Sequence, residues 1–490
     1  VAMAGQRHQY LVALAALLSS LAPAVHSFLS YGSWHSAHLC RSHLDLKSFV
    51  NYKKVVVGAL PTGDREISPH INFDGFDYLS HWYPVSWARD VPYNKPIQVT
   101  VFDVDYVISR VPKSKTNPNL STEKNKYQIP EDQDEMIALL DKCPHKLASL
   151  SEGRVSACGK LFQCAYHGWS FDGTTGQCVE IPQVVASEGL KSSGLEPSER
   201  SSTTKNRADT TAVPAMIQQG MVWLFPGGSL EQALLVPPPP RIPELDLEGY
   251  QFVPAVRDFP IDWAILLENI MDPDHGLFAH QALPFDLYSA SKQHPQVIQE
   301  KTTNQGKGWL IQSEVDAVTK LRAYDSARRG KDTQKEKQNG KASTPLRATS
   351  TFHAPSHVVL ARRHGADDKV SSQTTFWVCP TGVGRSRFMS ALVTRKTPVP
   401  IPRWLVHVGL NNFLDQDTHL LATAQKHVLD AEAVASEESE EEGGGGGLGP
   451  RRSSYVYRSP TEKLGARLAA FFDATLPRSP NRRAALRGWR

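Results

Sequence analysis

Short apolar runs along the chain predict two structured regions joined by a proline-rich segment. From His81 to about Pro226 these runs are separated by Gly, Asp and Asn, a pattern typical of strands and turns. Residues 97–102 alternate between apolar and polar positions, and residues 220–225 favour a buried strand. Residues 236–243 contain five prolines, which indicates a boundary between the two regions.

The second region mixes two kinds of pattern. Residues 373–378 favour a strand, whereas residues 263–271 and 417–429 favour helices. A β-rich region followed by a mixed region predicts an α+β fold, with domains at residues 78–235 and 245–430.

Three further segments depart from these patterns. Residues 186–211 are rich in Ser, Glu, Lys and Thr, and residues 326–345 are polar and rich in Lys, so we expect a loop insertion in each domain. Residues 436–490 begin with an acidic block and five glycines, which favours a linker and a loose C-terminal tail. The last apolar piece, residues 464–472, is short and at best amphipathic.

Residues 1–54 predict a leader. A basic start precedes an apolar run over residues 11–25, which is too short to span a bilayer comfortably and is typical of a signal peptide. Residues 28–54 contain one acidic and four basic residues with several serines, which is transit-peptide composition. The two parts resemble the bipartite plastid leaders of algae with secondary plastids, and a plain secretory signal is the alternative. Beyond this leader, no segment offers the roughly 18 apolar residues of a spanning helix.

The composition narrows the possible functions. Hydrophobic residues make up 40% of the 490, which is typical of globular domains and argues against a membrane bundle. The net charge of +4 comes from 54 basic and 50 acidic residues, a balance that does not predict nucleic-acid binding. Six cysteines are too few for a disulfide scaffold, but three of them lie between positions 143 and 164, which indicates metal or redox chemistry.

The crowded cysteines belong to a pattern of paired metal ligands. Cys143-x-His145 is followed, after eighteen residues, by Cys164-x-x-His167, so each of two loops offers one thiolate and one imidazole. This pattern suits a Rieske [2Fe–2S] centre, in which two thiolates hold one iron and two imidazoles hold the other. A structural zinc site is the alternative, but zinc pairs usually combine two cysteines with two histidines at other spacings. The sequence therefore predicts a [2Fe–2S] cluster held by these four residues.

A second group of ligands follows the first. His275 and His280 are five residues apart, and Asp272 precedes His275 by three. On a continuous helix the two histidines would point about 140° apart, so Pro273 and Gly276 are expected to bend the chain. Two histidines and one carboxylate leave open positions on Fe(II) for O2. Alone, the pattern could also be a surface helix end with scattered acidic and histidine residues. It favours a mononuclear iron site because it follows the predicted cluster ligands by about 110 residues, the order that Rieske oxygenases have.

The carboxylate of that site has two candidates. The helical stretch 411–425 contains Asp415 and Asp417, which face different sides of a helix. Acidic residues are also common at solvated helix N-termini, which could explain one or both. Near the histidines, Glu268 and Asn269 are further candidates for catalytic residues, with helix packing or capping as their alternative role.

The residues around these ligands resemble a known family, the Rieske oxygenases. The segments that carry the resemblance are 141–145 (DKCPH), 150–153 (LSEG), 166–173 (YHGWSFDG) and 178–183 (CVEIPQ). They are most similar to the pheophorbide a oxygenase group of plants and algae, which includes chlorophyllide a oxygenase and a component of the chloroplast import machinery. The resemblance covers about residues 80–430.

The resemblance implies an architecture and a mechanism. We expect an all-β Rieske domain followed by a helix-grip (START-like) α+β domain that holds a mononuclear iron. The family pattern, a Gln-Asp pair opening a helix, favours Asp417 over Asp415 as the third iron ligand. The cluster of one subunit would pass electrons to the iron of its neighbour in a head-to-tail homotrimer. Asp272 would bridge a cluster histidine to an iron histidine.

The resemblance also implies partners, a substrate and a location. Reduced ferredoxin is the expected electron donor, since no G-x-G-x-x-G nucleotide-binding unit follows a predicted strand. The expected reaction is O2-dependent oxygenation of a chlorophyll-derived tetrapyrrole such as pheophorbide a or chlorophyllide a, or of another hydrophobic plastid compound. We expect a plastid location with possible peripheral membrane association, although plant members often end in spanning segments that this sequence does not show.

Two other classes of Rieske protein are alternatives. The subunits of cytochrome bc and b6f complexes carry an extra cysteine in each cluster loop, and the corresponding positions here are Ala148 and Ala165. That class is therefore disfavoured. A non-catalytic redox component of a plastid envelope protein-import complex would keep the cluster, but only an oxygenase strictly needs the mononuclear iron ligands.

Overall fold

The computed structural model describes most of the chain after residue 70. The described residues are 71–112, 134–157, 159–187, 207–272, 275–280, 290–292, 297–315, 319–321, 346–364, 370–395, 402–441 and 449–489. All of them belong to one compact unit, Pro69–Arg490. The predicted leader, the insertion at 326–345 and most of the insertion at 186–211 lie outside the described residues.

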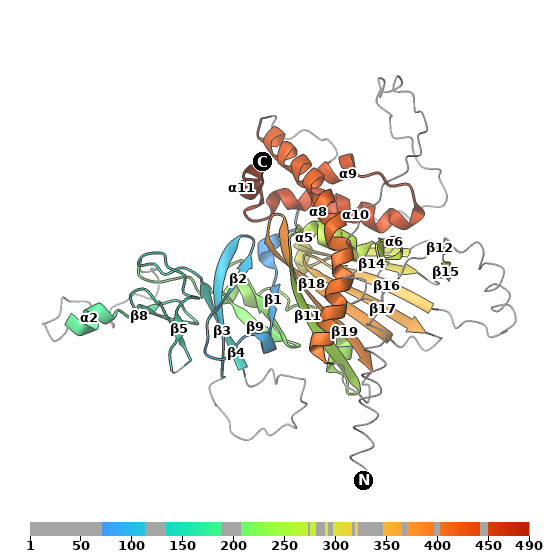
Figure 1. Ribbon diagram of the computed structural model, residues 1–490. Coiled ribbons are helices and arrows are strands. Elements are labelled where there is room, and N and C mark those ends of the chain that lie inside the picture. Colours follow the sequence, from blue (N-terminus) through green and yellow to red (C-terminus); the bar gives the residue numbers. More distant parts are fainter. Residues whose placement is uncertain are drawn as a thin grey trace, which may run out of the picture. The chain divides into compact units, whose positions relative to one another are not determined.

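The N-terminal part of this unit consists of three small antiparallel sheets (Figure 1). Their strand orders are β1-β10-β9, β2-β3-β4 and β5-β6-β7-β8. The bounds are β1 Tyr83–Trp87, β2 Ile97–Val101, β3 Val104–Pro112, β4 Asp134–Leu140, β5 Arg154–Val155, β6 Leu161–Gln163, β7 Ser170–Asp172, β8 Cys178–Glu180, β9 Ala215–Gln218 and β10 Met221–Leu224. The predicted strand at 220–225 is β10, which is buried at every position because it lies between β1 and β9.

The second part is built on a seven-stranded antiparallel sheet of order β11-β19-β18-β17-β16-β14-β13. A separate pair, β12 and β15, lies outside it. The bounds are β11 Tyr250–Phe259, β12 Ala290–Lys292, β13 Val297–Thr303, β14 Gly308–Val315, β15 Thr319–Leu321, β16 Leu346–His353, β17 His357–His364, β18 Val370–Gly382 and β19 Arg385–Arg395. The order from β16 to β19 follows from consecutive hairpins. The long connection from β11 to β13 carries the two predicted iron-ligating histidines, His275 and His280.

The two faces of this sheet have different partners. Phe352 lies on one face and packs against Phe471 of helix α10, with ring centroids 6.1 Å apart. Trp377 lies on the other face and packs edge-on against Trp87 of β1, at 5.5 Å. The indole N–H of Trp87 also donates to the Ala255 carbonyl at 2.9 Å, so the first part of the unit is joined to the sheet by direct contacts.

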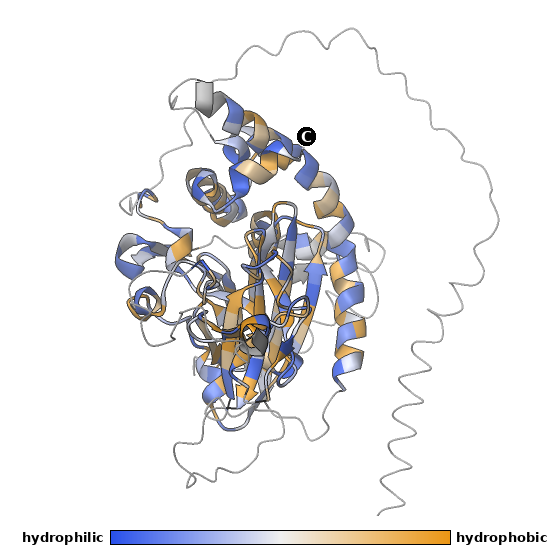
Figure 2. Ribbon diagram, turned by 90° about the vertical axis from the view of Figure 1, so that its left-hand side faces the viewer, coloured by the Kyte–Doolittle hydropathy of each residue, from blue (hydrophilic) through white to orange (hydrophobic). Residues whose placement is uncertain are grey.

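Two helices carry the chain toward the predicted iron site. The bounds of the helices are α2 Pro182–Ser187, α3 Leu230–Leu234, α4 Pro243–Asp246, α5 Trp263–Met271, α6 His275–Phe278, α8 Arg403–Glu441, α9 Pro450–Ser454, α10 Lys463–Thr475 and α11 Arg482–Arg487. Helix α5 matches its prediction and is capped by Asp262, whose carboxylate accepts from the Ala264 N–H at 3.1 Å. Helix α8 spans 39 residues and carries both hydrophilic and hydrophobic residues (Figure 2). Asp417 lies well inside α8, so the expectation that it opens a helix is wrong.

The C-terminal segment differs from the predicted loose tail. Its helices α9, α10 and α11 fold back onto α5 and α8 (Figure 1). Phe471 stacks on Trp309 at 4.6 Å between ring centroids, and Phe472 packs edge-on against Trp263 at 5.7 Å. The apolar piece at 464–472 is therefore a core helix. In the part of the chain that the structure describes, no helix is long and apolar enough to cross a membrane.

Candidate metal centres

The two predicted cluster loops share one backbone arrangement. The N–H groups of Cys143 and Cys164 each donate to the carbonyl five residues later, at 2.8 and 2.9 Å. The carbonyls of the same cysteines accept from Leu147 and Gly168, four residues later, at 2.9 and 3.0 Å. These two residues have left-handed backbones, with φ of 63° for Leu147 and 75° for Gly168. Each loop is thus a tight turn that begins at its cysteine ligand.

The loops place sulfur inside and imidazole outside. Cys143 and Cys164 are buried in a small core of their own, and their thiols form a hydrogen bond. His145 is exposed, and its ring centroid lies 4.5 Å from that of His167. Trp169 stacks on His145 at 4.6 Å and holds the ring in place. Two thiols and two imidazoles therefore converge from two loops.

The chemistry of these groups fits a metal cluster. Burial raises the pKa of Cys143 to about 11, and the adjacent Cys164 adds to the effect. At neutral pH the Cys143 thiol would therefore lose its proton only when a cation such as iron binds the resulting thiolate. At His167, desolvation and then the neighbouring His145 and Lys146 lower the pKa, which favours the neutral imidazole that a metal ligand must be. A [2Fe–2S] cluster fits with the thiols on one iron and the imidazoles on the other.

Side chains outside the turns hold both loops. The carboxylate of Asp141 accepts from the N–H and hydroxyl of Ser151, at 2.7 and 2.6 Å, and from the Gln98 amide at 3.0 Å. In the second loop, the Gln183 amide donates to the His167 carbonyl at 2.9 Å. The loop geometry therefore has support from residues that are not themselves ligands.

The second centre consists of His275, His280 and Asp417, whose ligand atoms all lie within 4.8 Å of one another. The Asp417 carboxylate lies 3.3 Å from Nε2 of His280 and 3.9 Å from Nε2 of His275. Nδ1 of His275 lies 2.6 Å from the Asp272 carbonyl oxygen, which can only accept a hydrogen bond. His275 is therefore assigned a proton on Nδ1, and its Nε2 lone pair faces the centre.

The surroundings of this centre favour a bound cation. Burial, with the nearby His275 adding to it, lowers the pKa of His280 to about 4, so this imidazole is neutral. Burial raises the pKa of Asp417, although His275 and the Asn269 amide act against that shift. The His280 ring also stacks on Phe413 at 3.5 Å, which fixes its orientation. Two imidazoles and a buried carboxylate are the ligand set of non-haem Fe(II) sites with open positions.

The structure separates the two candidate carboxylates. Asp417 faces the histidines and is 6% exposed. Asp415 lies on the outer side of the same helix, where it pairs with Arg257. The separation follows from helix geometry, because residues two apart point about 200° from one another. Asp417 is thus the acid that the fold brings to the centre.

The other predicted residues lie in different places. Nδ2 of Asn269 lies 3.5 Å from Nε2 of His275, at the border of the centre. The side chain of Asp272 is exposed at the end of α5, and its backbone carbonyl makes the contact with His275. Glu268 points elsewhere: its carboxylate pairs with Arg451 of α9, at 3.0 Å.

Sequence reasoning missed three residues that act around these centres. Trp169 and Phe413 lie within the segments used for prediction, but an aromatic residue near a ligand is as readily a core residue. Arg451 lies in a segment rich in arginine, a pattern that usually indicates a solvated surface. Its burial depends on acidic partners far away in the sequence, so no local signal could have shown it.

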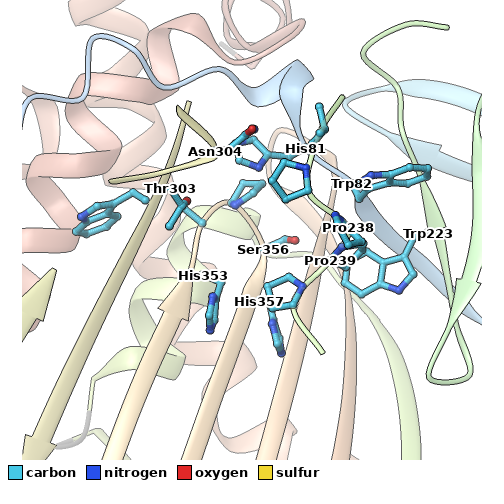
Figure 3. Close-up of a pocket in the computed structure, with 16 residues that line it drawn as sticks. His81, Trp82, Trp223, Pro238, Pro239, Thr303, Asn304, His353, Ser356 and His357 are labelled. Atoms are coloured by element: carbon cyan, nitrogen blue, oxygen red, sulfur yellow. The ribbon is translucent and has the colours of Figure 1, made fainter. Parts of the chain in front are cut away.

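A pocket of about 150 Å³ has no predicted metal ligand among its lining residues (Figure 3). Its lining includes His81, Trp82 and Trp223, the proline-rich segment 236–240 and the turn 353–357. This volume is below the roughly 300–1,000 Å³ of typical ligand pockets. The pocket is therefore not assigned to the chemistry of either centre.

Comparison with known families identifies both parts of the chain. Residues 81–193 match the Rieske [2Fe-2S] domain, and residues 352–435 match the pheophorbide a oxygenase domain. The first match contains all four predicted cluster ligands, and the second contains Asp417. The predicted Rieske domain and α+β fold are confirmed.

Similar proteins agree with the family matches. The chain is 28% identical to flavonoid 8-hydroxylase 2 of Ocimum basilicum, over 81% of the chain and 68% of that protein. It is 33% identical to pheophorbide a oxygenase of Oryza sativa subsp. japonica, over 44% of the chain and 36% of that protein. The fold matches the crystal structure of dicamba monooxygenase, with a TM-score of 0.51 at 16% identity, over 81% of this chain and 97% of that chain.

The chain spans between about one third and two thirds of the length of the curated relatives that it matches. Within that span it carries the matches to the Rieske domain and to the pheophorbide a oxygenase family, and the candidate ligand sets of both centres. Two segments of the chain therefore match a Rieske [2Fe-2S] domain and the pheophorbide a oxygenase family, and the chain is similar over part of its length to proteins named pheophorbide a oxygenase and chlorophyllide a oxygenase.

Proposed function

We propose that this protein is a Rieske-type oxygenase. The observation that carries the proposal is the convergence of His275, His280 and Asp417 in a chain that also has a Rieske domain. The cluster would supply single electrons, and Fe(II) in this ligand set would activate O2 at its open positions. The protein keeps the imidazole of His280 neutral and buried, and places Asn269 beside two of the ligands.

The proposed route for electrons runs between subunits. The imidazoles of His145 and His167 lie at the outer side of the Rieske loops, where another molecule can approach them. Asp272 exposes its carboxylate at the end of α5, three residues before His275. In the proposed head-to-tail homotrimer, Asp272 would accept a hydrogen bond from a cluster histidine of the neighbouring subunit. Its backbone carbonyl already orients His275.

The proposed substrate is a chlorophyll-derived tetrapyrrole, such as pheophorbide a or chlorophyllide a, or another hydrophobic plastid compound. The names of two relatives, pheophorbide a oxygenase and flavonoid 8-hydroxylase 2, support a planar and largely apolar substrate. Both relatives are chloroplastic, which supports a plastid location together with the predicted leader. Reduced ferredoxin is the proposed donor. Peripheral membrane association stays a prediction, and the apolar side of α10 is occupied by core packing.

Iron counting and a turnover assay test the proposal on the full chain. We expect three irons per chain, and oxygenation when reduced ferredoxin, O2 and candidate pigments or flavonoids are supplied. His275→Ala should keep the Rieske absorption spectrum, lose one iron and abolish turnover. His427→Ala, at an exposed position of the same α8 that carries Asp417, is the matched control and should be silent. Two irons per chain in the wild type would favour a non-catalytic redox component instead. Surviving turnover in His275→Ala would contradict the iron assignment.

A further inference from the structure

Five charged side chains form a buried cluster between the C-terminal segment and the helices that carry the iron-site residues. We call this cluster the clamp. Its members are Asp262, Glu268, Glu432, Arg451 and Arg482. Asp262 caps the start of α5, and Glu268 lies in the last turn of the same helix. Glu432 lies on α8, and the two arginines lie on α9 and α11. Four members are at most 7% exposed, and the Glu268 side chain is 14% exposed.

Each arginine of the clamp joins carboxylates on two different helices. Arg451 pairs with Glu268 of α5, at 3.0 Å from Nε to Oε1, and with Glu432 of α8. Arg482 donates to Glu432 at 2.6 Å and to Asp262 at 3.0 Å. Helices α5 and α8 are therefore linked through the C-terminal segment at both ends of α5.

These two helices must meet for the iron centre to exist. Helix α5 carries Asn269 and leads directly to His275, and α8 carries Asp417. Glu268 and Asn269 are adjacent, so the helical step of about 100° turns one toward Arg451 and the other toward His275. A shift of α5 against α8 would thus separate the ligands from one another.

Docking of the C-terminal segment does not by itself require these charges. The rings of Phe471 and Phe472 already pack against Trp309 and Trp263. Taking ions out of water is costly, and apolar replacements of buried ion pairs are often neutral or stabilising. What the clamp adds over apolar packing is directional contact, which fixes one relative position of the helices.

We infer that residues 449–489 position the mononuclear centre, with Arg451 as the main positioning residue. By holding α5 against α8, the clamp sets the spacing of His275, His280 and Asp417 and hence their metal affinity. The inference rests on the proposed function for the assignment of iron to these ligands. A ligand set whose supporting residues are lost becomes loose and binds metal more weakly, typically by 10- to 100-fold for outer-shell partners.

Fe(II) titration of the full chain, under anaerobic conditions and with the Rieske cluster intact, tests this inference. Arg451→Met should weaken Fe(II) binding at the mononuclear centre by roughly tenfold or more and leave the Rieske spectrum unchanged. Arg451→Lys keeps the charge but not the planar fork, so it should recover part of the affinity. Arg452→Met is the matched control, because Arg452 on the same helix pairs with Asp473 outside the clamp. It should bind Fe(II) like the wild type.

Wild-type Fe(II) affinity in a folded Arg451→Met chain would overturn the inference. If that variant fails to fold, Arg451→Lys decides the question: binding about threefold weaker is expected, and unchanged binding overturns the inference. Turnover is measured separately. A chain whose Fe(II) affinity depends on Arg451 but which oxygenates nothing would contradict the proposed function and leave the positioning role standing.

Discussion

Leu147 and Gly168 occupy equivalent places in the two cluster loops, yet only one of them is a glycine. Both residues have left-handed backbones, which cost a residue with a Cβ about 1–2 kcal/mol. Leu147 is 63% exposed, so its side chain meets no obstacle. At Gly168 an added Cβ would lie 3.1 Å from Cγ of Pro182. A side chain there would therefore cause both backbone strain and a tight contact with Pro182.

Stability measurements on the two loops should show this asymmetry. We expect Gly168→Ala to lower the free energy of unfolding by about 1–2 kcal/mol, because of backbone strain and the contact with Pro182. Leu147→Gly relieves the backbone strain but increases the conformational entropy of the unfolded chain. Because these two effects oppose each other, the free energy of unfolding should change by less than about 1 kcal/mol. The free energies of unfolding of both variants can be measured by denaturant titration, with the loss of Rieske absorption as the signal. Equal stability of Gly168→Ala and the wild type would contradict the argument.

Residues that are close in sequence were the predictable part of the site. The cluster ligands follow from their spacing in two short pairs, whereas the histidine pair gains its meaning from its position after that motif. The third iron ligand came from the family pattern, and the helix start that supported it is wrong, since Asp417 lies inside α8. The partners of Glu268 could not be predicted, because Arg451 and Tyr455 lie more than 180 residues away in the chain.

At the scale of elements, α5 and α10 show where local pattern is sufficient. Helix α5 starts and ends as predicted, because its Asp262 cap and its apolar run are local features. Helix α10 has an equally clear apolar side, but its packing partners, Trp309 and Trp263, come from distant elements. A segment of this length is marginal alone, so only tertiary contacts decide whether it folds. The loose-tail prediction failed for that reason.

The link between α5 and α9 should depend on pH through Glu268. Burial raises the pKa of Glu268 to about 7, and the nearby Glu432 adds to this rise. Arg451 and the Tyr455 hydroxyl act in the opposite direction, because they favour the ionised form of Glu268. The folded state thus binds this proton more tightly than the unfolded state, where the pKa is about 4.3. The contribution of Glu268 to stability is therefore complete below pH 4 and decreases as the pH rises through 7.

Glu268→Gln should remove this pH dependence, because glutamine imitates the protonated acid. We expect the free energy of unfolding of the variant, relative to the wild type, to increase between about pH 4.5 and 7 and to level off above that range. Glu231→Gln, at an exposed position of α3, is the control and should give a flat difference. A flat difference for Glu268→Gln as well would show that its folded pKa is ordinary.

At the scale of the whole molecule, electrons can pass from a cluster to the iron of the same chain or to the iron of a neighbouring subunit. The proposed trimer lets each cluster serve the iron of the next subunit, whereas transfer within one chain would make assembly irrelevant. The two routes can be separated with His145→Ala chains, which lack a cluster ligand, and His275→Ala chains, which lack an iron ligand. Each variant alone should be inactive by either route.

Mixed trimers of the two variants should regain turnover. In a head-to-tail ring, every mixed trimer contains one place where an intact cluster faces an intact iron, so we expect about one third of the wild-type rate per trimer. Coexpression with two different tags and purification by both tags isolates these assemblies. A trimer in which every chain carries both substitutions is the control and should stay inactive. Mixed trimers of the correct size that show no turnover would contradict transfer between subunits.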